Sequence, residues 1–520
     1  MRNIITTFAF LLTINSFSQV YVNISNTSGT YDGNSWATAY NNIQDGIDHA
    51  FSAGGAEVWV AQGTYYIYES STENTLRLKK DVFVYGGFSG TESTLEERDW
   101  NMFETIIDGH EFSGSTNRVK HVVTALLDDG DTFWNNGLID GFIIQGGYAV
   151  NAEPPGKNSK ATDPVSIMAS NGEGAGAGIL IFQCSVNVSN CIIQNNEASK
   201  AGGVYVMVAD EFPTMSPNAA PNFTNCIIQN NHATMRGGGM QCDLASHPSL
   251  ESCKFLNNSC DAKGGGLYND FGCSPTLTNC LFAFNTALRA GGMGNDGSSS
   301  PILINCTISK NYTTDVGAGI YTGSYNPDGP SNEPTLVNCI VYGNETLWGG
   351  PADLRVWHTN YFYINNSDLG NGFTSFGTGN ILSDPMFVDA DGGDFKLQAS
   401  SPCRDAGTQI DAPEYDIDGF ARDANPDMGA YEYQLTEIQN NTDFSNSINI
   451  FPNPASIIVT IQSDKLLGNI EFFDITGKTV FSKIINDKTT EIPVHDLCSG
   501  IYFVKTNNVV SKLVISHQPR

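Results

Sequence analysis

Short apolar segments with the same order of residues recur through the middle of the chain. Each begins with Asn or Ser followed by Cys, continues with apolar residues two positions apart, and ends on Asn. The cysteines of these segments are Cys191, Cys226, Cys253, Cys280, Cys306 and Cys339. Alternation over four or five residues, as at Cys280, Phe282 and Phe284, predicts short β-strands. No unit contains ten residues of helical periodicity, so the pattern predicts an all-β repeat.

The spacing of these cysteines gives the size of the repeating unit. Consecutive cysteines are 35, 27, 27, 26 and 33 residues apart, a period typical of solenoids. Three short strands and three turns occupy about 26 residues, which is one coil of a right-handed parallel β-helix. Coils of such a helix stack about 4.8 Å apart, so equivalent side chains form ladders.

The cysteine column is expected inside the solenoid. Neighbouring cysteines of a parallel stack point the same way, which is poor disulfide geometry, so we expect buried, reduced thiols. Cys184 and Cys273, each seven residues before a column cysteine, predict a second, shorter stack. The Asn that precedes five of the six cysteines can bond the backbone at a turn and form its own ladder. Gly-Gly pairs between the segments supply either positive φ or room for close approach of two backbones.

Two short motifs within the units resemble a known family. Phe255 to Asn258 and Phe282 to Asn285 read FxxN, and GGGL and GAGI stand nearby. These pairs resemble the repeats of chlamydial polymorphic outer-membrane proteins and, more widely, the pectin-lyase-like β-helix superfamily. The resemblance covers roughly residues 138 to 345 and implies the fold, not an activity.

The sequence on either side of the repeats predicts further parts. Residues 1–18 have Arg2 followed by an apolar run and small residues, which is typical of a secretory signal peptide. Residues 34–51 place Ile43, Ile47, Ala50 and Phe51 at helical spacing. We interpret residues 19–105 as an N-terminal cap leading into the first coils, with a small independent domain as the alternative, and residues 106–382 as the β-helix. No later stretch of about 18 apolar residues predicts a membrane-spanning helix.

Residues 383–433 contain the stretches SDPMFVDADGGDFKLQASSPCRDAG and DIDGFARDANPDMGAYEY. They resemble the choice-of-anchor Q segment, which follows β-helices in many bacterial surface proteins. Five of its aspartates could supply oxygen ligands for Ca²⁺, although Asp-Gly pairs are also ordinary turn residues. These metal candidates are Asp389, Asp391, Asp394, Asp416 and Asp418.

Residues 447–520, which follow a polar linker at 434–446, carry several motifs in a characteristic order. They are Pro452-Asn453-Pro454, Asp474 with Gly477-Lys478, and Gly500-Ile501-Tyr502 before a basic terminal strand. This region resembles the C-terminal sorting domain of the type IX secretion system of Bacteroidetes, a small β-sandwich. The resemblance implies the type IX machinery as a partner, removal of the sorting domain after export, and an extracellular or surface-attached protein. It says nothing about the activity of the protein.

Composition narrows the range of partners. The formal net charge is −29 and only 16% of the residues are charged, so a nucleic-acid partner is not expected. No GxSxG, HExxH, P-loop or dinucleotide-binding motif occurs. Apart from the possible Ca²⁺, no cofactor is indicated.

One column of charged residues offers candidate ligand-binding groups. Before the Gly-Gly pair stand Lys200, Arg236, Lys263 and Arg289, and seven residues after the last three stand Asp243, Asp270 and Asp296. Stacked cations repel one another unless an anion lies beside them. The aspartates neutralise the cations internally, or the cations form an open track for an acidic polysaccharide.

These observations support two classes of function. We interpret the chain as an exported, non-catalytic β-helix protein that binds glycans or other cell surfaces. The alternative is a carbohydrate-active enzyme: a polysaccharide lyase that uses a cation and a basic residue, or a hydrolase that uses paired carboxylates. For an enzyme, the insert from Tyr148 to Gly174 and the loop from Asp210 to Pro221 are candidate walls of a cleft.

Overall fold

The computed structural model describes most of the chain. The residues it describes are 19–127, 134–150, 174–207, 220–323, 331–349, 352–357, 361–370, 377–434, 448–463, 466–474, 478–495, 497–506 and 509–516. The predicted signal peptide, most of both candidate wall loops, nearly all of the linker and Gly477 therefore lie outside the described residues. The chain divides into two compact units, Met1–Gln434 and Leu435–Arg520.

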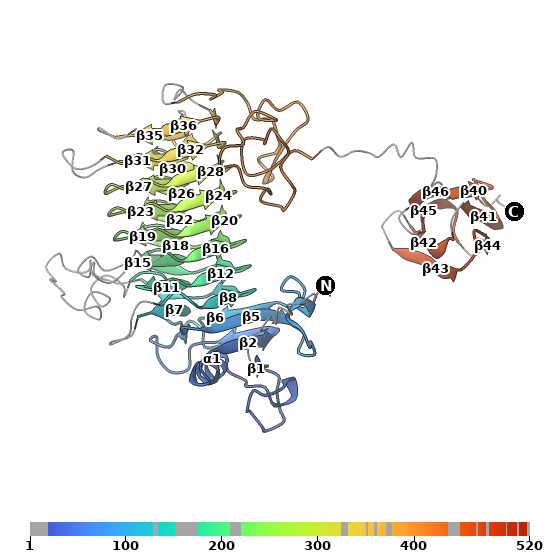
Figure 1. Cartoon of the computed structure of the whole chain (residues 1–520), viewed down its shortest axis with the longest axis horizontal. Helices are drawn as coiled ribbons and strands as arrows, with labels where there is room; N and C mark the ends of the chain where they lie inside the picture. The colour runs from blue at the N-terminus through green and yellow to red at the C-terminus, as the bar shows by residue number, and fades with distance from the viewer. Residues whose placement is uncertain are drawn as a thin grey trace, which may run out of the picture. The chain divides into compact units, whose positions relative to one another are not determined.

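The first unit is a right-handed parallel β-helix whose strands stack as rungs from β1 at one end to β36 near the other (Figure 1). Four long sheets run along it, which we call A, B, C and D. Sheet A contains β1 (Gln19–Val22), β2 (Ala56–Ala61), β5 (Val82–Phe88), β8 (Leu138–Asp140), β12 (Asn187–Ser189), β16 (Asn222–Thr224), β20 (Ser249–Glu251), β24 (Thr276–Thr278), β28 (Ile302–Ile304), β32 (Thr335–Val337) and β36 (Tyr363–Asn365). Sheet B contains β3 (Gly63–Tyr66), β6 (Thr105–Asp108), β9 (Ile143–Gln145), β13 (Ile192–Gln194), β17 (Ile227–Gln229), β21 (Lys254–Leu256), β25 (Leu281–Ala283), β29 (Thr307–Ser309), β33 (Ile340–Tyr342) and β37 (Asp368–Leu369).

The coil returns through two further sheets. Sheet D contains β10 (Tyr148–Ala149), β14 (Glu197–Lys200), β18 (His232–Arg236), β22 (Ser259–Lys263), β26 (Thr286–Arg289), β30 (Tyr312–Val316) and β34 (Glu345–Thr346). Sheet C contains β4 (Leu76–Arg77), β7 (Val123–Leu126), β11 (Ile179–Phe182), β15 (Val204–Met207), β19 (Met240–Asp243), β23 (Leu267–Asn269), β27 (Met293–Asn295), β31 (Ile320–Thr322) and β35 (Leu354–Val356). The prediction of three strands per coil was therefore wrong for most coils, which have four.

Single residues of left-handed conformation make the corners between sheets. Asn225, Asn279 and Asn305 turn the chain from sheet A to sheet B with φ of 52°, 52° and 49°. A second such corner leads into sheet D, and there Phe284 has φ of 59°. Phe284 is thus a corner residue and not, as predicted, the third member of an alternating strand. Asn adopts this conformation readily because its short amide can bond nearby backbone.

The Gly-Gly pairs are required by close approach between coils. A Cβ on Gly239 would lie 2.6 Å from the carbonyl oxygen of Gly266, and one on Gly203 would lie 2.4 Å from that of Gly239. Positive φ falls instead on the residue before each pair, such as Ala201 or Gly264. Of the two roles left open by the sequence, close packing of backbones is the one that applies.

The interior holds one continuous apolar core, and the cysteine column lies inside it as predicted. All six column cysteines are fully buried and unpaired, and each thiol points at a carbonyl oxygen of the preceding coil, as Cys280 does at Leu250 over 3.6 Å. Phe255 and Phe282 stack with ring centroids 4.4 Å apart. Cys184 and Cys273 are also buried and free. Identical residues stack in this way because parallel strands are paired in register.

The last Asn of each segment forms a second ladder inside the coil, which we call the inner Asn ladder. Its members are Asn196, Asn231, Asn258, Asn285, Asn311 and Asn344. Each amide nitrogen donates to a sheet B carbonyl of the preceding coil, and all but the last also donate to the amide oxygen of the next Asn, as Asn285 does to Phe255 and Asn311. The last member, Asn344, donates to the carboxylate of Asp353 instead. These contacts explain why the FxxN motif ends on Asn.

The N-terminal end carries the predicted helix, though a shorter one. Helix α1 (Ile43–Ser52) follows a 3-10 turn, η1 (Trp36–Thr38), and begins where Asn42 accepts a hydrogen bond from the backbone of Gln44. Ile43, Ile47 and Ala50 join the core, whereas Phe51 is exposed and lies beneath the ammonium group of Lys79. A second 3-10 turn, η2, spans Leu95–Glu97. No helix within the described residues is long and apolar enough to cross a membrane.

The second unit consists of two antiparallel sheets around their own apolar core. One sheet contains β40 (Ile448–Phe451), β41 (Ile458–Ser463) and β44 (Thr489–Pro493), and the other contains β42 (Gly468–Phe473), β43 (Thr479–Ile485), β45 (Gly500–Thr506) and β46 (Val509–Ile515). The side chain of Asn453 joins the Pro-Asn-Pro motif to β46 by bonding the backbone of Lys512 and Val514. This is the small β-sandwich that the sequence motifs imply.

Candidate functional site

The four cations of the predicted ladder are register partners on successive rungs of sheet D. Lys200 pairs with Arg236, Arg236 with Lys263, and Lys263 with Arg289. The three aspartates stand at or just beyond the ends of β19, β23 and β27 in the adjoining sheet C. The sequence therefore placed both columns correctly on the β-helix.

Three of these cations form ion pairs with an aspartate of the next coil. Arg236 contacts the carboxylate of Asp270, and Lys263 lies 2.8 Å from that of Asp296. Arg289 lies 2.6 Å from Asp315, an aspartate of β30 that the sequence analysis did not single out. Asp270 and Asp296 are buried, whereas the cations are partly exposed. Of the two alternatives for the ladder, internal neutralisation by aspartate is the one these ion pairs favour.

Lys200 and Asp243 occupy the first position of the two columns. Asp243 accepts hydrogen bonds from the hydroxyl of Tyr205 at 2.9 Å and from the amide of Gln241 at 3.1 Å. Burial lowers the pKa of Lys200, and the negative charge of Asp243 opposes this shift. Burial also raises the pKa of Asp243, against the effect of the nearby Lys200. Transfer of either charge from water to this site is therefore costly.

Tyrosines of sheet C complete the polar network. The guanidinium of Arg236 lies 5.4 Å from the ring centre of Tyr268, and the hydroxyl of Tyr268 donates to Asp296 over 2.5 Å. Burial raises the pKa of Asp270 to about 6, with repulsion from Asp243 and Asp296 adding to the shift and Arg236 opposing it. The carboxyl group of Asp270 could hold a proton near neutral pH, but its side chain is fully buried.

Among the described residues, which include all five predicted metal candidates, no three His, Cys, Asp or Glu side chains are grouped to hold an ion. Lys396 lies among three of these candidates: its ammonium is 3.1 Å from Asp418, and the charges of Asp394 and Asp416 raise its pKa further. Asp391 forms an ion pair with Lys310 at 2.7 Å, and Asp389 accepts a hydrogen bond from the backbone of Gly392. Lysines thus supply positive charge beside these carboxylates, and Ca²⁺ binding stays an untested prediction.

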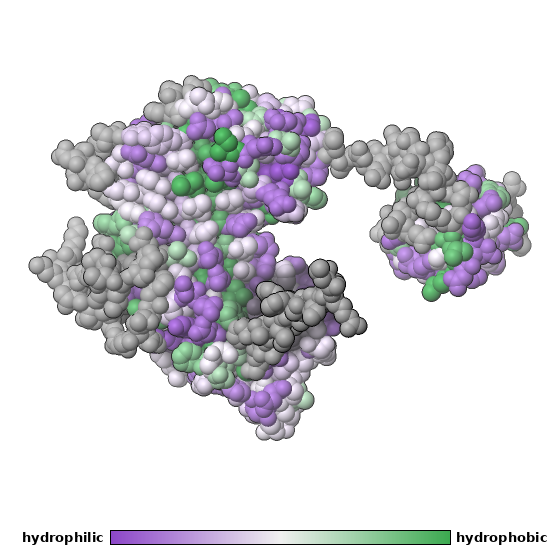
Figure 2. Space-filling model, in the orientation of Figure 1, coloured by the Kyte–Doolittle hydropathy of each residue, from purple (hydrophilic) through white to green (hydrophobic). Residues whose placement is uncertain are grey.

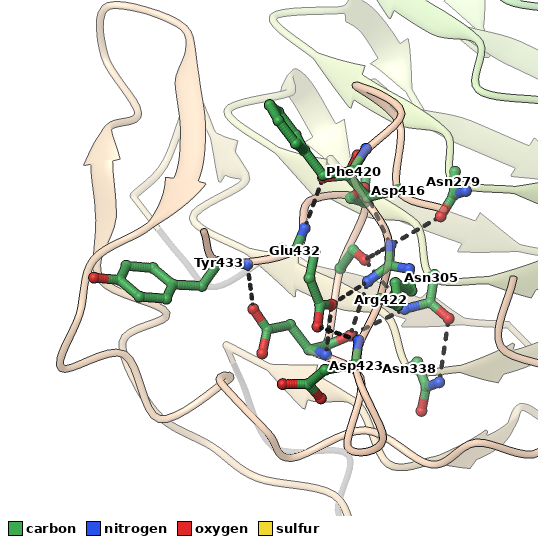
Figure 3. Close-up of polar contacts among 12 residues, drawn as sticks. Asn279, Asn305, Asn338, Asp416, Phe420, Arg422, Asp423, Glu432 and Tyr433 are labelled. Carbon is green, nitrogen blue, oxygen red and sulfur yellow. Dashed lines mark hydrogen bonds and ion pairs between the residues drawn. The ribbon is translucent and has the colours of Figure 1, made fainter. Parts of the chain in front are cut away.

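Asp416 belongs to a buried network that the sequence analysis missed, centred on Arg422 (Figure 3). The guanidinium of Arg422 lies 3.0 Å from Glu432 and donates to the side-chain oxygen of Asn279 at 2.9 Å. Asp416 accepts from the backbone nitrogens of Phe420 and Glu432. Arg422 and Glu432 are both almost fully buried, so this network is part of the structural core of residues 383–433.

The same network fastens residues 383–433 to the side of the β-helix. Three successive corner asparagines donate to its backbone: Asn279 to Tyr415, Asn305 to Asp427 and Asn338 to Thr408. This lateral segment, as we call residues 383–433, includes the hairpin of β38 (Phe387–Asp389) and β39 (Asp394–Leu397). It lies beside the last coils of the β-helix (Figure 1).

Two family models match parts of the chain. Residues 214–388 match the family described as right handed beta helix region, and residues 449–516 match the secretion system C-terminal sorting domain. No curated protein is significantly similar in sequence.

Among solved structures, the chain is similar to pectate lyase Pel9A, with 15% identity, a TM-score of 0.44, and coverage of 80% of this chain and 96% of that one. It is also similar to the A-module of the mannuronan C-5 epimerase AlgE4 of Azotobacter vinelandii, with 14% identity, a TM-score of 0.35, and coverage of 67% and 87%. An exopolygalacturonase of Thermotoga maritima matches with 13% identity, a TM-score of 0.26, and coverage of 68% and 89%.

The sorting domain indicates export and handling by the type IX secretion machinery, with the protein at the cell surface or released. Together with the stacked parallel sheets, it identifies the chain as a secreted right-handed parallel β-helix protein that carries a type IX C-terminal sorting domain.

Proposed function

We propose that this exported protein binds glycans at the cell surface or in the medium without cleaving them. The observation that carries the proposal is that three of the four cations of the charged ladder are neutralised by aspartates of the chain itself. Its three ion-paired cations are each bound to an aspartate, and Asp270 and Asp296 are almost fully inaccessible to solvent. A general acid or base must come within hydrogen-bond reach of its substrate. Asp270 and Asp296 could reach a substrate only if their ion pairs with Arg236 and Lys263 broke.

The same ion pairs change the expected class of glycan. An open row of cations would attract an acidic polysaccharide, whereas neutralised cations attract it weakly. The whole chain is also strongly acidic. On the face shown in Figure 2, apolar areas are narrow and interrupted by polar ones. These features favour an uncharged glycan bound through hydrogen bonds.

One observation favours the alternative, a carbohydrate-active enzyme. Asp243, Asp270 and Asp296 stand on successive rungs, and Asp270 has a pKa raised to about 6. Two neighbouring carboxylates, one protonated and one ionised, are the catalytic pair of a glycoside hydrolase. Cations also stand beside these carboxylates. A polysaccharide lyase uses a cation and a basic residue, so it is a second form of this alternative.

One experiment separates the two functions. Residues 19–520, the chain without its predicted signal peptide, are incubated with uncharged polysaccharides and with polyuronates, and both binding and reaction products are measured. We expect binding of an uncharged glycan with no new reducing ends and no unsaturated product. The variant Asp270→Asn should bind as the parent does. Product formation that this variant abolishes would establish the enzyme instead, and absence of all glycan binding would refute the proposal.

A further inference from the structure

The outward face of sheet B is divided into a covered part and an open part. Over β25, β29 and β33 the lateral segment packs on the sheet. Leu281 and Ala283 belong to one buried apolar cluster with Phe395 and Tyr431 of this segment. On β9, β13 and β17, the outward residues at the same register positions are partly exposed: Ile143, Gln145, Ile192, Gln194, Ile227 and Gln229.

The border between the two parts lies at β21. Lys254 of this strand forms an ion pair with Asp418 of the lateral segment at 3.5 Å. Its other outward residue, Leu256, packs against the apolar cluster beneath the segment. The lateral segment therefore forms a wall at one end of the open part.

The open part carries a continuous ladder of side-chain amides. The amide nitrogen of Gln229 donates to the oxygen of Gln194 at 2.8 Å, and that of Gln194 donates to Gln145 at 3.0 Å. Gln145 then donates to the carboxylate of Asp108 at 2.8 Å. The other oxygen of Asp108 lies 2.6 Å from Nδ1 of His110, so all the amides point towards this Asp–His pair.

A parallel row of isoleucines runs beside the amides. Ile106, Ile143, Ile192 and Ile227 are register partners on four successive strands, and all are partly exposed. No outward side chain of β9, β13 or β17 is charged. We call this face, the outward side of β6, β9, β13 and β17, the amide strip.

We propose that the amide strip binds an uncharged polysaccharide chain, an inference that rests on the proposed function and names its surface. Each ladder amide uses one of its two N–H groups on its neighbour. The second N–H and the remaining lone pairs of the oxygen can meet sugar hydroxyls, which also donate and accept. Such partners recur about every 4.8 Å, the spacing of neighbouring strands. The isoleucine row contacts the C–H face of the sugar, and the lateral segment limits the length of chain bound.

The charge of the strip is the reason for choosing an uncharged occupant. An acidic chain would gain no cation from β9, β13 or β17, and it would approach a protein of formal net charge −29. A basic protein partner would meet amide oxygens along β9, β13 and β17, but the first carboxylate of the strip is Asp108 of β6. A hydroxyl-rich neutral chain meets no unfavourable charge along the amide ladder.

The test uses residues 19–520 and two variants of this chain. In the first, Gln194→Ala and Gln229→Ala are combined, which removes two successive amides from the strip. The matched control is Asn222→Ala, which breaks an exposed amide contact to Asn187 in the same part of the β-helix but on sheet A. The probes are soluble β-glucan, mannan and xylan, with polygalacturonate as the charged comparison. Binding is measured by affinity electrophoresis and calorimetry, and folding by circular dichroism.

We expect the parent to bind at least one neutral probe with an affinity that changes little with salt. The double variant should bind roughly thirtyfold more weakly, since two hydrogen bonds of about 1 kcal/mol each are lost. The control should bind as the parent does. Unchanged binding in the double variant would overturn the amide strip and leave the proposed function standing. Preference for polygalacturonate would overturn it too. Dimerisation through this face, seen in sedimentation, would likewise overturn the amide strip alone. Failure to bind any glycan would refute both the strip and the proposed function.

Discussion

The inner Asn ladder allows a quantitative prediction for the variant Asn285→Ala. The amide of Asn285 donates to the carbonyl oxygen of Phe255 at 2.8 Å and to Asn311 at 2.9 Å. Its oxygen accepts from both the backbone and the side-chain nitrogen of Asn258, each at 3.0 Å. Truncation to Ala removes all four contacts at a place with no exposure to solvent.

The cost follows from the groups left behind. Two N–H groups of Asn258 lose their acceptor, and a buried donor without a partner costs about 1–3 kcal/mol. We therefore expect the free energy of unfolding to fall by about 2–6 kcal/mol. The loss falls on the contacts between neighbouring coils, which provide much of the stability of a solenoid.

Urea unfolding of residues 19–520, followed by circular dichroism, measures this change in the free energy of unfolding. The matched control is Asn222→Ala, which removes an exposed laddered amide and should cost at most about 0.5 kcal/mol. The midpoint should shift strongly for the first variant at an unchanged slope, and hardly for the second. Equal midpoints for the two variants would show that the inner ladder adds nothing beyond an exposed one, and would refute the reasoning.

Four other predictions concern the thiols, the carboxylates, Arg422 and the sorting domain. Cys280→Ala should lower the free energy of unfolding by about 1–2 kcal/mol, because it leaves a small cavity. A thiol reagent added to the folded protein should label only Cys498, the one exposed cysteine. Labelling of several thiols in the folded protein would contradict the buried cysteine column. The folded pKa of Asp270 is about 6, above its unfolded value, so the folded state binds the Asp270 proton more tightly than the unfolded state. The free energy of unfolding should therefore fall as pH rises through about 4–6. Asp270→Asn should flatten that part of the pH–stability profile, and an unchanged slope would argue against the raised pKa. Arg422→Met leaves Glu432 as a buried unpaired charge and should cost about 3–5 kcal/mol, seen as proteolysis within the lateral segment before the β-helix; equal resistance to protease would count against a fastening role. Deletion of residues 447–520 should leave the β-helix folded but block its delivery to the cell surface. Protease added to intact cells of the native host measures this delivery. Normal delivery of the truncated protein would contradict the assignment of the sorting domain.

The sequence predicted the β-helix well because its ladders repeat residue types at fixed spacing. The thiol column and the charged column follow from counting alone, since parallel coils keep equivalent residues in register. The fourth strand per coil was missed because its rungs, such as β14 and β26, show no alternation of their own. The single-residue corner at Phe284 was missed because an aromatic side chain at positive φ is uncommon.

The site was harder to predict, because its contacts run between coils and between distant segments. Whether Arg236 meets Asp270 depends on side-chain direction across one coil, which spacing does not specify. The contact of Arg422 with Asn279 joins residues 143 positions apart, so no local sequence pattern predicts it. The amide strip did leave a signal in the sequence, namely Gln three residues after Cys191 and Cys226, which equals the register of the ladder.

The fastening of the lateral segment to three successive corner asparagines has an evolutionary consequence. A duplicated coil inserted between Cys226 and Cys253 would find the same cysteine and inner Asn partners above and below it, because these two ladders continue through this part of the β-helix. An insertion between Asn279 and Asn338 would instead carry those asparagines away from Tyr415, Asp427 and Thr408, the backbone groups they bind. A coil added upstream would thus preserve the contacts of the lateral segment, whereas a coil added beneath the segment would break them.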